Sequence, residues 1–417
     1  MVTPAPAEVF TQLKQHFSAR ASVTYRLMGR NAVEAAASGC RVELSDGRTP
    51  LDFGAYAVGL LGHRPPEVVE AVREQLDRMT ISTRILANPT TARAAAALAG
   101  HFADAYPARP ALPRVYFGLN GSDAVEVATK LARLVTGRPR ILAVTGAYHG
   151  KSLGALALTH HPGFRAGLED SLPATTHLSP DDPDAVDREC RRGDVAALVF
   201  EPVQGEYGVR PLPTEVLAAW CRSAREHGAV VIADEIQTGL RRCGEPSLAL
   251  AQGLPVDALL LGKPLGGGVM PLSAMLCTEA LYQPLEDNPS MHTATFSGHP
   301  LSCATVPAAL ATVERHAERG RAVEAAVRDG LTGLAERHAA LVHEVRGQGL
   351  LWALELRDEA LLGQAVQALA KRGLLVSPCV SSPTTLRLLP PIVATDAEVA
   401  EALEILDAVL GALAPKP

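Results

Sequence analysis

The chain has 417 residues, of which 47% are hydrophobic and 20% are charged. This composition excludes a disordered or collagen-like protein and leaves room for about two or three packed units. With 39 basic and 45 acidic residues, the net charge of −6 argues against nucleic acid or an anionic membrane surface as the main partner.

The sequence also predicts a cytoplasmic protein. It contains no uncharged apolar stretch of bilayer-spanning length, and its opening segment lacks the layout of a secretory signal. Its seven cysteines stand singly, without a C-x-x-C pair. That usage is typical of a reducing compartment and indicates neither a disulfide framework nor a metal site.

Along the chain, the first elements are short. Residues 41–53 predict two short strands around a turn at Asp46–Gly47. Residues 67–79 predict a helix that has proline near its start.

From about residue 113, short apolar runs alternate with helical patterns. The expected strands lie within residues 114–120, 140–146, 195–206, 229–239 and 257–268. Because these runs are apolar at successive positions, they fit strands that helices cover on both faces, which predicts an α/β fold with a mostly parallel sheet.

After about residue 300 the pattern changes to two Ala-rich helices, followed by strands within 345–356 and 386–391. We therefore expect three segments. Residues 1–60 join a small domain, residues 61–300 form the large domain, and residues 301–417 form the small α+β domain.

Chemistry-bearing residues follow five of the expected strands. In open α/β sheets, ligands bind beyond the carboxyl ends of the strands. Those ends carry Asn120–Ser122, Tyr148–Gly150, Glu201–Glu206, Asp234–Gln237 and Lys263.

Gly121 and Ser122 lie between a strand and a helix expected to begin near Asp123. A helix N-terminus offers free N–H groups and partial positive charge, which suits a phosphate. The alternative is that Ser122 is an ordinary N-cap.

Lys263 ends an apolar strand and precedes three glycines, Gly266 to Gly268. Pro264 and Asp257 break the pattern of a nucleotide-binding P-loop. Partial desolvation would favour the neutral amine that forms an imine, whereas the alternative is a surface lysine.

Asp234 follows five apolar residues and has no arginine nearby in the sequence. A nearly buried carboxylate requires a cationic partner, which a protonated pyridine nitrogen would provide. The alternative is that Asp234 caps a turn.

These motifs, taken together, resemble those of the class III pyridoxal-phosphate aminotransferases of fold type I. This group includes ornithine, acetylornithine, 4-aminobutyrate and putrescine aminotransferases. The resemblance implies a large domain with a mostly parallel seven-stranded sheet and a small α+β domain built from both chain ends. The motifs that carry it are Tyr148–Lys151, Glu201–Glu206, Asp234–Gly239 and Gly262–Gly268.

The resemblance also implies residue roles toward pyridoxal 5′-phosphate. Lys263 would attach the cofactor covalently and move a proton, and Asp234 would pair with the pyridinium. Thr295 would reach the phosphate from the second subunit, which implies a homodimer with shared active sites. The remaining implied cofactor contacts are Gly121, Ser122, Tyr148, His149, Ile236 and Gln237.

Four residues are implied substrate contacts. Arg387 would bind an α-carboxylate, and Glu206 would neutralise that arginine when an ω-amine is bound. Lys151 stands where many members of the family have arginine. It is therefore expected to bind a remote carboxylate of the substrate more weakly than arginine would. Tyr56 is a candidate substrate-facing ring, with ordinary packing as the alternative.

The function that follows is transfer of an amino group from an amino acid, ω-amine or diamine to a 2-oxo acid, in two half-reactions. One alternative keeps the cofactor but catalyses racemisation, epimerisation or decarboxylation, because the fold hosts these too. A third hypothesis, a catalytically inactive binding protein, is disfavoured by the presence of Lys263 and Asp234.

Overall fold

A seven-stranded sheet forms the centre of the computed structural model, which describes residues 4–414. Strand β12 pairs antiparallel with both of its neighbours, β4 and β11, and the other pairs in the sheet are parallel. This confirms the predicted α/β fold with a mostly parallel seven-stranded sheet. The strands, in spatial order, are β4 (Arg114–Gly118), β12 (Ser273–Cys277), β11 (Ala258–Leu261), β10 (Val230–Asp234), β7 (Val195–Phe200), β5 (Arg140–Val144) and β6 (Thr175–Leu178).

The central strands are buried on both faces, as their continuous apolar runs predict. In β5, Leu142 and Val144 belong to one core cluster, whereas Ile141 and Ala143 belong to the cluster on the other face. Helix α9 (Thr214–Glu226) packs into the first cluster and α5 (Gly121–Thr136) into the second. Side chains therefore alternate between two helix-covered faces, which leaves the strand ends as the place for polar chemistry.

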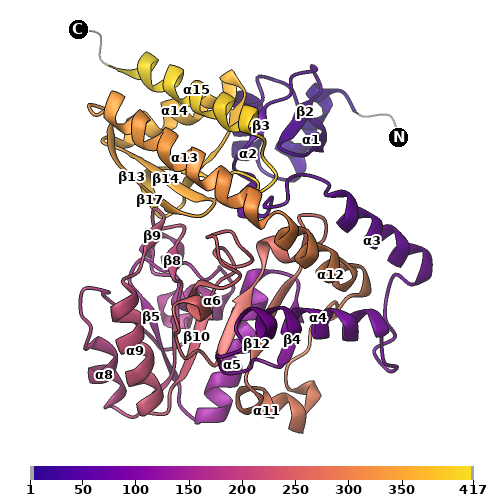
Figure 1. The fold of residues 1–417 in the computed structure, drawn as a ribbon, viewed down its shortest axis with the longest axis vertical. Helices are drawn as coiled ribbons and strands as arrows, with labels where there is room; N and C mark the ends of the chain where they lie inside the picture. The colour runs from indigo at the N-terminus through magenta and orange to yellow at the C-terminus, as the bar shows by residue number, and fades with distance from the viewer. Residues whose placement is uncertain (1–3, 415–417) are drawn as a thin grey trace.

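The second unit is built from both ends of the chain, which lie together in Figure 1 as the indigo and the orange-to-yellow segments. The short strand β3 (Leu51–Asp52) pairs in parallel with β15 (Leu374–Leu375). One sheet is β1 (Glu34–Ser38), β2 (Arg41–Leu44), β3 and β15, and the other is β13 (Val342–Gln348), β14 (Leu351–Leu356), β17 (Ser382–Leu388) and β16 (Ser377–Cys379). The boundaries at residues 60 and 300 stay a prediction.

Helices connect and cover these sheets. Helix α12 (Pro300–Arg315) packs against α3 (Pro66–Arg78) and α4 (Pro89–Ala105), beside the large sheet in Figure 1. The second unit carries α13 (Ala317–Arg337), α14 (Glu359–Arg372) and α15 (Asp396–Leu413). The remaining elements are α1 (Pro6–His16), α2 (Ala19–Met28), α6 (Leu153–Leu158), α7 (Pro162–Arg165), α8 (Ala185–Cys190), α10 (Leu248–Ala251), α11 (Glu279–Asp287), β8 (Val203–Gln204), β9 (Arg210–Pro211) and the 3-10 turns η1 (Ala55–Ala57), η2 (Glu169–Ser171), η3 (Lys263–Gly266) and η4 (Pro289–Met291).

The local predictions agree with the structure, with one correction. The helix expected at 67–79 is α3, which begins at Pro66, and the strands expected within 41–53 are β2 and β3. Helix α5 begins at Gly121, two residues before Asp123, and its N-cap is Asn120, so the alternative in which Ser122 is the N-cap is wrong. The reason is a capping box, in which the side chain of Asn120 accepts from the amide of Asp123 and the carboxylate of Asp123 accepts from the amide of Asn120.

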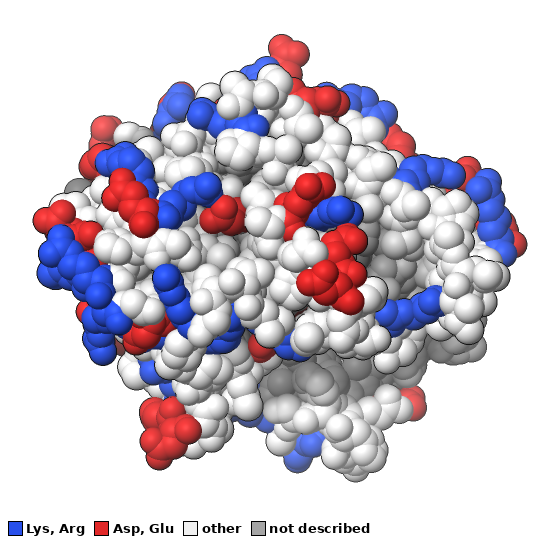
Figure 2. All heavy atoms as spheres, turned by 90° about the horizontal axis from the view of Figure 1, so that it is seen from below, with Lys and Arg blue, Asp and Glu red and all other residues white. Residues whose placement is uncertain are grey.

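The surface carries charges of both signs. Figure 2 shows acidic and basic side chains interspersed on one face, with uncharged residues between them. Within residues 4–414, no helix combines the length and the apolar character needed to cross a membrane. All seven cysteines are buried and unpaired.

Candidate active site

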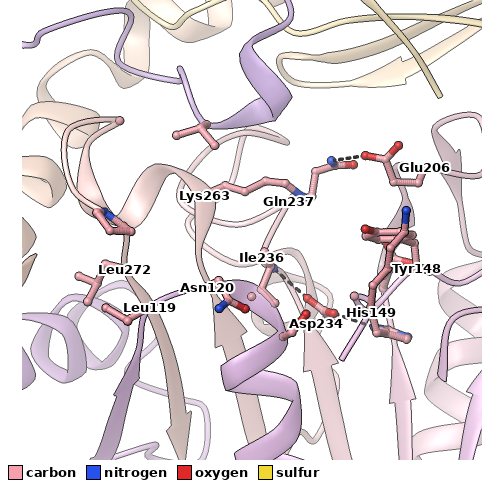
Figure 3. Close-up of a pocket in the computed structure, with 18 of the residues that line it drawn as sticks. Leu119, Asn120, Tyr148, His149, Glu206, Asp234, Ile236, Gln237, Lys263 and Leu272 are labelled. Carbon is pink, nitrogen blue, oxygen red and sulfur yellow. Dashed lines mark hydrogen bonds and ion pairs between the residues drawn. The ribbon is translucent and has the colours of Figure 1, made fainter. Parts of the chain in front are cut away.

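A cavity of about 580 Å³ lies where the predicted strand ends meet. Segments that follow β4, β5, β7, β10 and β11 line it, together with Val58 and residues 268–272. The structure therefore brings most of the predicted residues to one place (Figure 3). Those that line the cavity are Gly121, Ser122, Tyr148, His149, Lys151, Glu206, Asp234, Ile236, Gln237 and Lys263.

The N-terminus of α5 forms one wall of the cavity. Its first-turn amides, at Gly121 and Ser122, have no partner inside the helix and lie at the positive end of its dipole. A Cβ on Gly121 would lie 3.0 Å from Cδ1 of Ile236, and one on Gly262 would lie 3.0 Å from Cγ2 of the same side chain. Two glycines thus let Ile236 pack tightly between the helix and the lysine-bearing loop.

Asp234, which is 4% exposed, has a cationic partner that the sequence reasoning did not assign. Nδ1 of His149 lies 2.6 Å from Oδ2 of Asp234, while Oδ1 accepts a hydrogen bond of 3.1 Å from the amide of Ile236 (Figure 3). Burial opposes the imidazolium, but the hydrogen bond and charge of Asp234 outweigh it and raise the pKa of His149. The carboxylate of Asp234 therefore caps a turn through one oxygen and is stabilised in the cavity by the charge of His149 through the other.

Lys263 begins η3 directly after β11 and adopts a φ of 39°, which is unusual for a residue with a side chain. Its amine makes no hydrogen bond or ion pair within residues 4–414. Burial lowers the pKa of this amine, Glu206 opposes the shift, and the charge of Arg387 adds to it. The lowered pKa shifts this amine toward the neutral form, which is the nucleophile that forms an imine.

Glu206 and Arg387 form a buried ion pair that joins the two units. Glu206 follows β8, whereas Arg387 lies on β17 and is 2% exposed. Oε1 of Glu206 accepts a hydrogen bond from Nη1 of Arg387. The same oxygen accepts a 3.2 Å hydrogen bond from Nε2 of Gln237, which Figure 3 shows. Burial disfavours the Glu206 carboxylate, but Arg387 and Lys263 outweigh it and lower its pKa.

Glu201 is a cavity residue to which the sequence reasoning gave no role. It is 5% exposed, lies directly after β7, and accepts a 2.8 Å hydrogen bond from the amide of Tyr148. Burial raises its pKa to about 7, and the charge of Asp234 adds to the shift, whereas His149 opposes it. Its place at a strand end was the signal available in the sequence.

Three predicted residues do not line this cavity. Arg387 lies behind Glu206. Tyr56 is 78% exposed in a turn where its φ is 50°, and only Val58 of that segment lines the cavity. Thr295 lies in an exposed loop, where its carbonyl oxygen accepts a hydrogen bond from Arg84.

Comparison with known families shows which family the chain belongs to. The model of the family described as aminotransferase class-III matches residues 26–410. The chain belongs to the class III aminotransferases.

Relatives of this aminotransferase act on several amines. It is 37% identical to a putrescine aminotransferase of Pectobacterium atrosepticum over 388 residues, which cover 89% of this chain and 81% of the relative. The ornithine aminotransferase of Toxoplasma gondii superposes with a TM-score of 0.87 at 28% identity, covering 99% and 96% of the two chains. An amine transaminase from an uncultivated Pseudomonas species, whose crystal structure is PLP-bound, superposes with a TM-score of 0.81 at 29% identity, covering 92% and 95%.

This aminotransferase depends on pyridoxal 5′-phosphate, and its cavity fits that cofactor. Among the described residues, Nε2 of His149 and Oε1 of Gln237 are buried without a hydrogen-bond partner. The unpaired amides of α5 suit a phosphate, and Lys263 supplies an amine that makes no hydrogen bond within the described chain. The family match supports transamination and does not favour racemisation, epimerisation or decarboxylation.

Proposed function

We propose that Lys263 and Asp234 are the catalytic residues of this transamination. Lys263 would attach the cofactor through Nζ and, once released, carry the proton between the reacting carbons, which the lowered pKa of its amine supports. Asp234 would hold the proton of the pyridine nitrogen, with His149 fixing its carboxylate. When bound, pyridoxal phosphate supplies the electron sink for the substrate carbon.

The remaining cavity residues would bind and orient the cofactor. Gly121 and Ser122 would hold its phosphate at the N-terminus of α5, and Tyr148 and Ile236 would contact the ring. Oε1 of Gln237 lacks a partner among the described residues, which supports a contact with the ring hydroxyl.

The donor that the geometry supports best is a terminal amine, such as a diamine or an ω-amino acid, with a 2-oxo acid such as 2-oxoglutarate as acceptor. The observation that carries this proposal is the intact Glu206–Arg387 pair. While Glu206 neutralises Arg387, a donor without an α-carboxylate can bind beside the pair, and Arg387 would leave Glu206 only when the α-carboxylate of the 2-oxo acid binds. The similarity to a putrescine aminotransferase agrees with it.

A panel of donors tests this proposal. The holoenzyme is mixed with putrescine, 4-aminobutyrate, ornithine or alanine, and cofactor absorbance follows each first half-reaction without acceptor. We expect the terminal amines to react faster than alanine, and added 2-oxoglutarate to give glutamate. Reaction with α-amino acids alone would contradict the terminal-amine assignment.

We also propose a homodimer in which Thr295 reaches the partner's phosphate site. Thr295 is exposed and does not line the cavity of its own subunit. The guanidinium of Arg84 donates hydrogen bonds to the carbonyl oxygens of Ala294 and Thr295. The chain around Arg84 exposes apolar side chains that a second copy would cover, namely Leu76, Met79, Ile81, Ile85 and Leu86. Sedimentation at assay concentration should show a dimer, and an active monomer would contradict the shared site.

We propose a cytoplasmic location for the enzyme. The seven unpaired cysteines support it, because such thiols persist in a reducing compartment.

A further inference from the structure

Lys151 is held at the cavity by an aromatic ring rather than by an acid. Its side chain is exposed, lines the cavity, and places Nζ 3.9 Å from the ring centroid of Phe164. It makes no ion pair within residues 4–414. A cation over an aromatic face is attracted by the quadrupole of the ring, more weakly than it would be by a carboxylate.

The ring of Phe164 is itself fixed by two neighbours. It meets the ring of Tyr148 edge-on, with centroids 6.3 Å apart and planes at 84°, and it packs against His161 at 4.7 Å. Tyr148 is a cavity residue, so the contact between Lys151 and Phe164 is tied to the wall of the site. Phe164 lies in the short helix α7, and its ring therefore has a fixed position beside Lys151.

Two acidic residues of the cavity are already in ion pairs. Glu206 pairs with Arg387, and Asp234 pairs with His149. Lys151 therefore differs from them, since its ammonium can leave the ring without separating an ion pair. A distal carboxylate of a ligand would attract this ammonium, whereas a distal ammonium would repel it.

We propose that Phe164 is a specificity-determining residue that holds the Lys151 ammonium against the cavity wall, an inference that rests on the amine and 2-oxo acid exchange proposed above. With an acceptor that has a second carboxylate, Lys151 leaves the ring and contacts that carboxylate. With a diamine donor, Lys151 stays on the ring and its charge is kept away from the second ammonium of the donor. One lysine thus serves two substrates of opposite distal charge.

Equilibrium binding to the holoenzyme tests this without turnover. Glutarate and pentanoate have five carbons and one carboxylate in common, and they differ only in the distal group. In Phe164→Leu or Phe164→Met, the ring attraction is gone and glutarate should bind roughly two- to fivefold more tightly. The affinity for pentanoate should stay the same, which also shows that the variant is folded, and Phe164→Tyr should behave as the parent enzyme does.

Lys151→Met is the matched control. It should weaken glutarate binding without affecting pentanoate, and it should abolish the effect of the Phe164 substitution in the double variant. Unchanged glutarate affinity in both apolar Phe164 variants, or an equal change for pentanoate, would overturn the proposal.

Turnover separates this inference from the proposed function. In Phe164→Leu, kcat/KM for 1,4-diaminobutane should fall roughly two- to fivefold relative to butylamine. If no terminal amine reacts with the parent enzyme, the donor assignment fails, while the glutarate comparison still decides the role of Phe164. If diamines react but the ratio does not change, the inference about Phe164 fails and the donor assignment stands.

Discussion

Replacing Arg387 by alanine should impair the half-reaction of the 2-oxo acid more than that of the amine. The structure places the guanidinium against Glu206 in a buried pair that is 2% exposed on the arginine side. A 2-oxo acid always offers an α-carboxylate, whereas a diamine does not. Arg387→Ala removes the group that would bind this carboxylate through two parallel hydrogen bonds.

The magnitude follows from the contacts that are lost. One bidentate, charge-assisted contact is worth about 2–4 kcal/mol, or roughly thirtyfold to a thousandfold in kcat/KM for the acceptor. Breaking the buried pair should also lower the free energy of unfolding by about 3 kcal/mol, toward the low end for such pairs. The low end applies because Glu206 keeps its hydrogen bonds to Gln237 and to the amide of Val380, each 3.2 Å long.

The stability loss should depend on pH. In the parent enzyme, Arg387 lowers the pKa of Glu206 below its ordinary value of 4.5. A carboxyl with a lowered pKa in the folded state contributes stability above its unfolded pKa, and this contribution disappears as pH falls through the folded value. The difference in the free energy of unfolding between the parent enzyme and Arg387→Ala should therefore be largest at pH 7. It should become smaller as the pH falls below about 4.5.

Rapid-mixing measurements of each half-reaction, with urea unfolding at several pH values, provide the assay. Arg387→Lys keeps the positive charge but lacks the planar guanidinium that forms two parallel hydrogen bonds. Relative to Arg387→Ala, it should therefore restore the free energy of unfolding more fully than it restores acceptor binding. Glu206→Gln should show the reverse kinetic preference, with α-amino acids gaining relative to terminal amines. Equal losses in both half-reactions for Arg387→Ala and Glu206→Gln would refute the reasoning and leave the pair a purely structural role.

Three further predictions concern the cavity. Borohydride reduction and peptide mapping should find the cofactor on Lys263, and label on another lysine would overturn its assignment. Asp234→Asn should keep the cofactor, as absorbance would show, but lose at least about a hundredfold in kcat, roughly 2.7 kcal/mol, because an amide cannot hold the pyridine proton; near-normal turnover would remove Asp234 from the mechanism. Since the pKa of Glu201 is raised from 4.5 to about 7, its burial should cost about 3 kcal/mol of stability as pH rises through that interval. Glu201→Gln should abolish this pH-dependent loss in urea unfolding, and an unchanged pH profile would contradict the raised pKa.

Local patterns were enough to predict the strands and several of the site residues. The apolar runs at 141–144 and 229–233 predict strands buried on both faces, since every successive side chain is apolar. Because parallel strands end at one edge of a sheet, the residues that follow them were expected to meet, and Gly121, Asp234 and Lys263 line one cavity.

Other features of the site depend on neighbours that are distant in the sequence. His149 and Asp234 are separated by 85 residues, and the partner of Asp234 could not be found in its local sequence. The φ of 39° at Lys263 is imposed by the surrounding loop and has no signature in residue type. Phe164 reaches Lys151 only because α7 folds back beside Tyr148.

By itself, then, the sequence determined the α/β layering and the residues that end each strand, because periodicity and strand direction act over a few residues. Only the tertiary structure decided which charges pair. Glu206, in the turn after β8, and Arg387, on β17, lie 181 residues apart, and their contact exists because packing brings that turn against β17. The free energy of a buried ion pair depends on that placement and on exclusion of water, neither of which a local pattern contains.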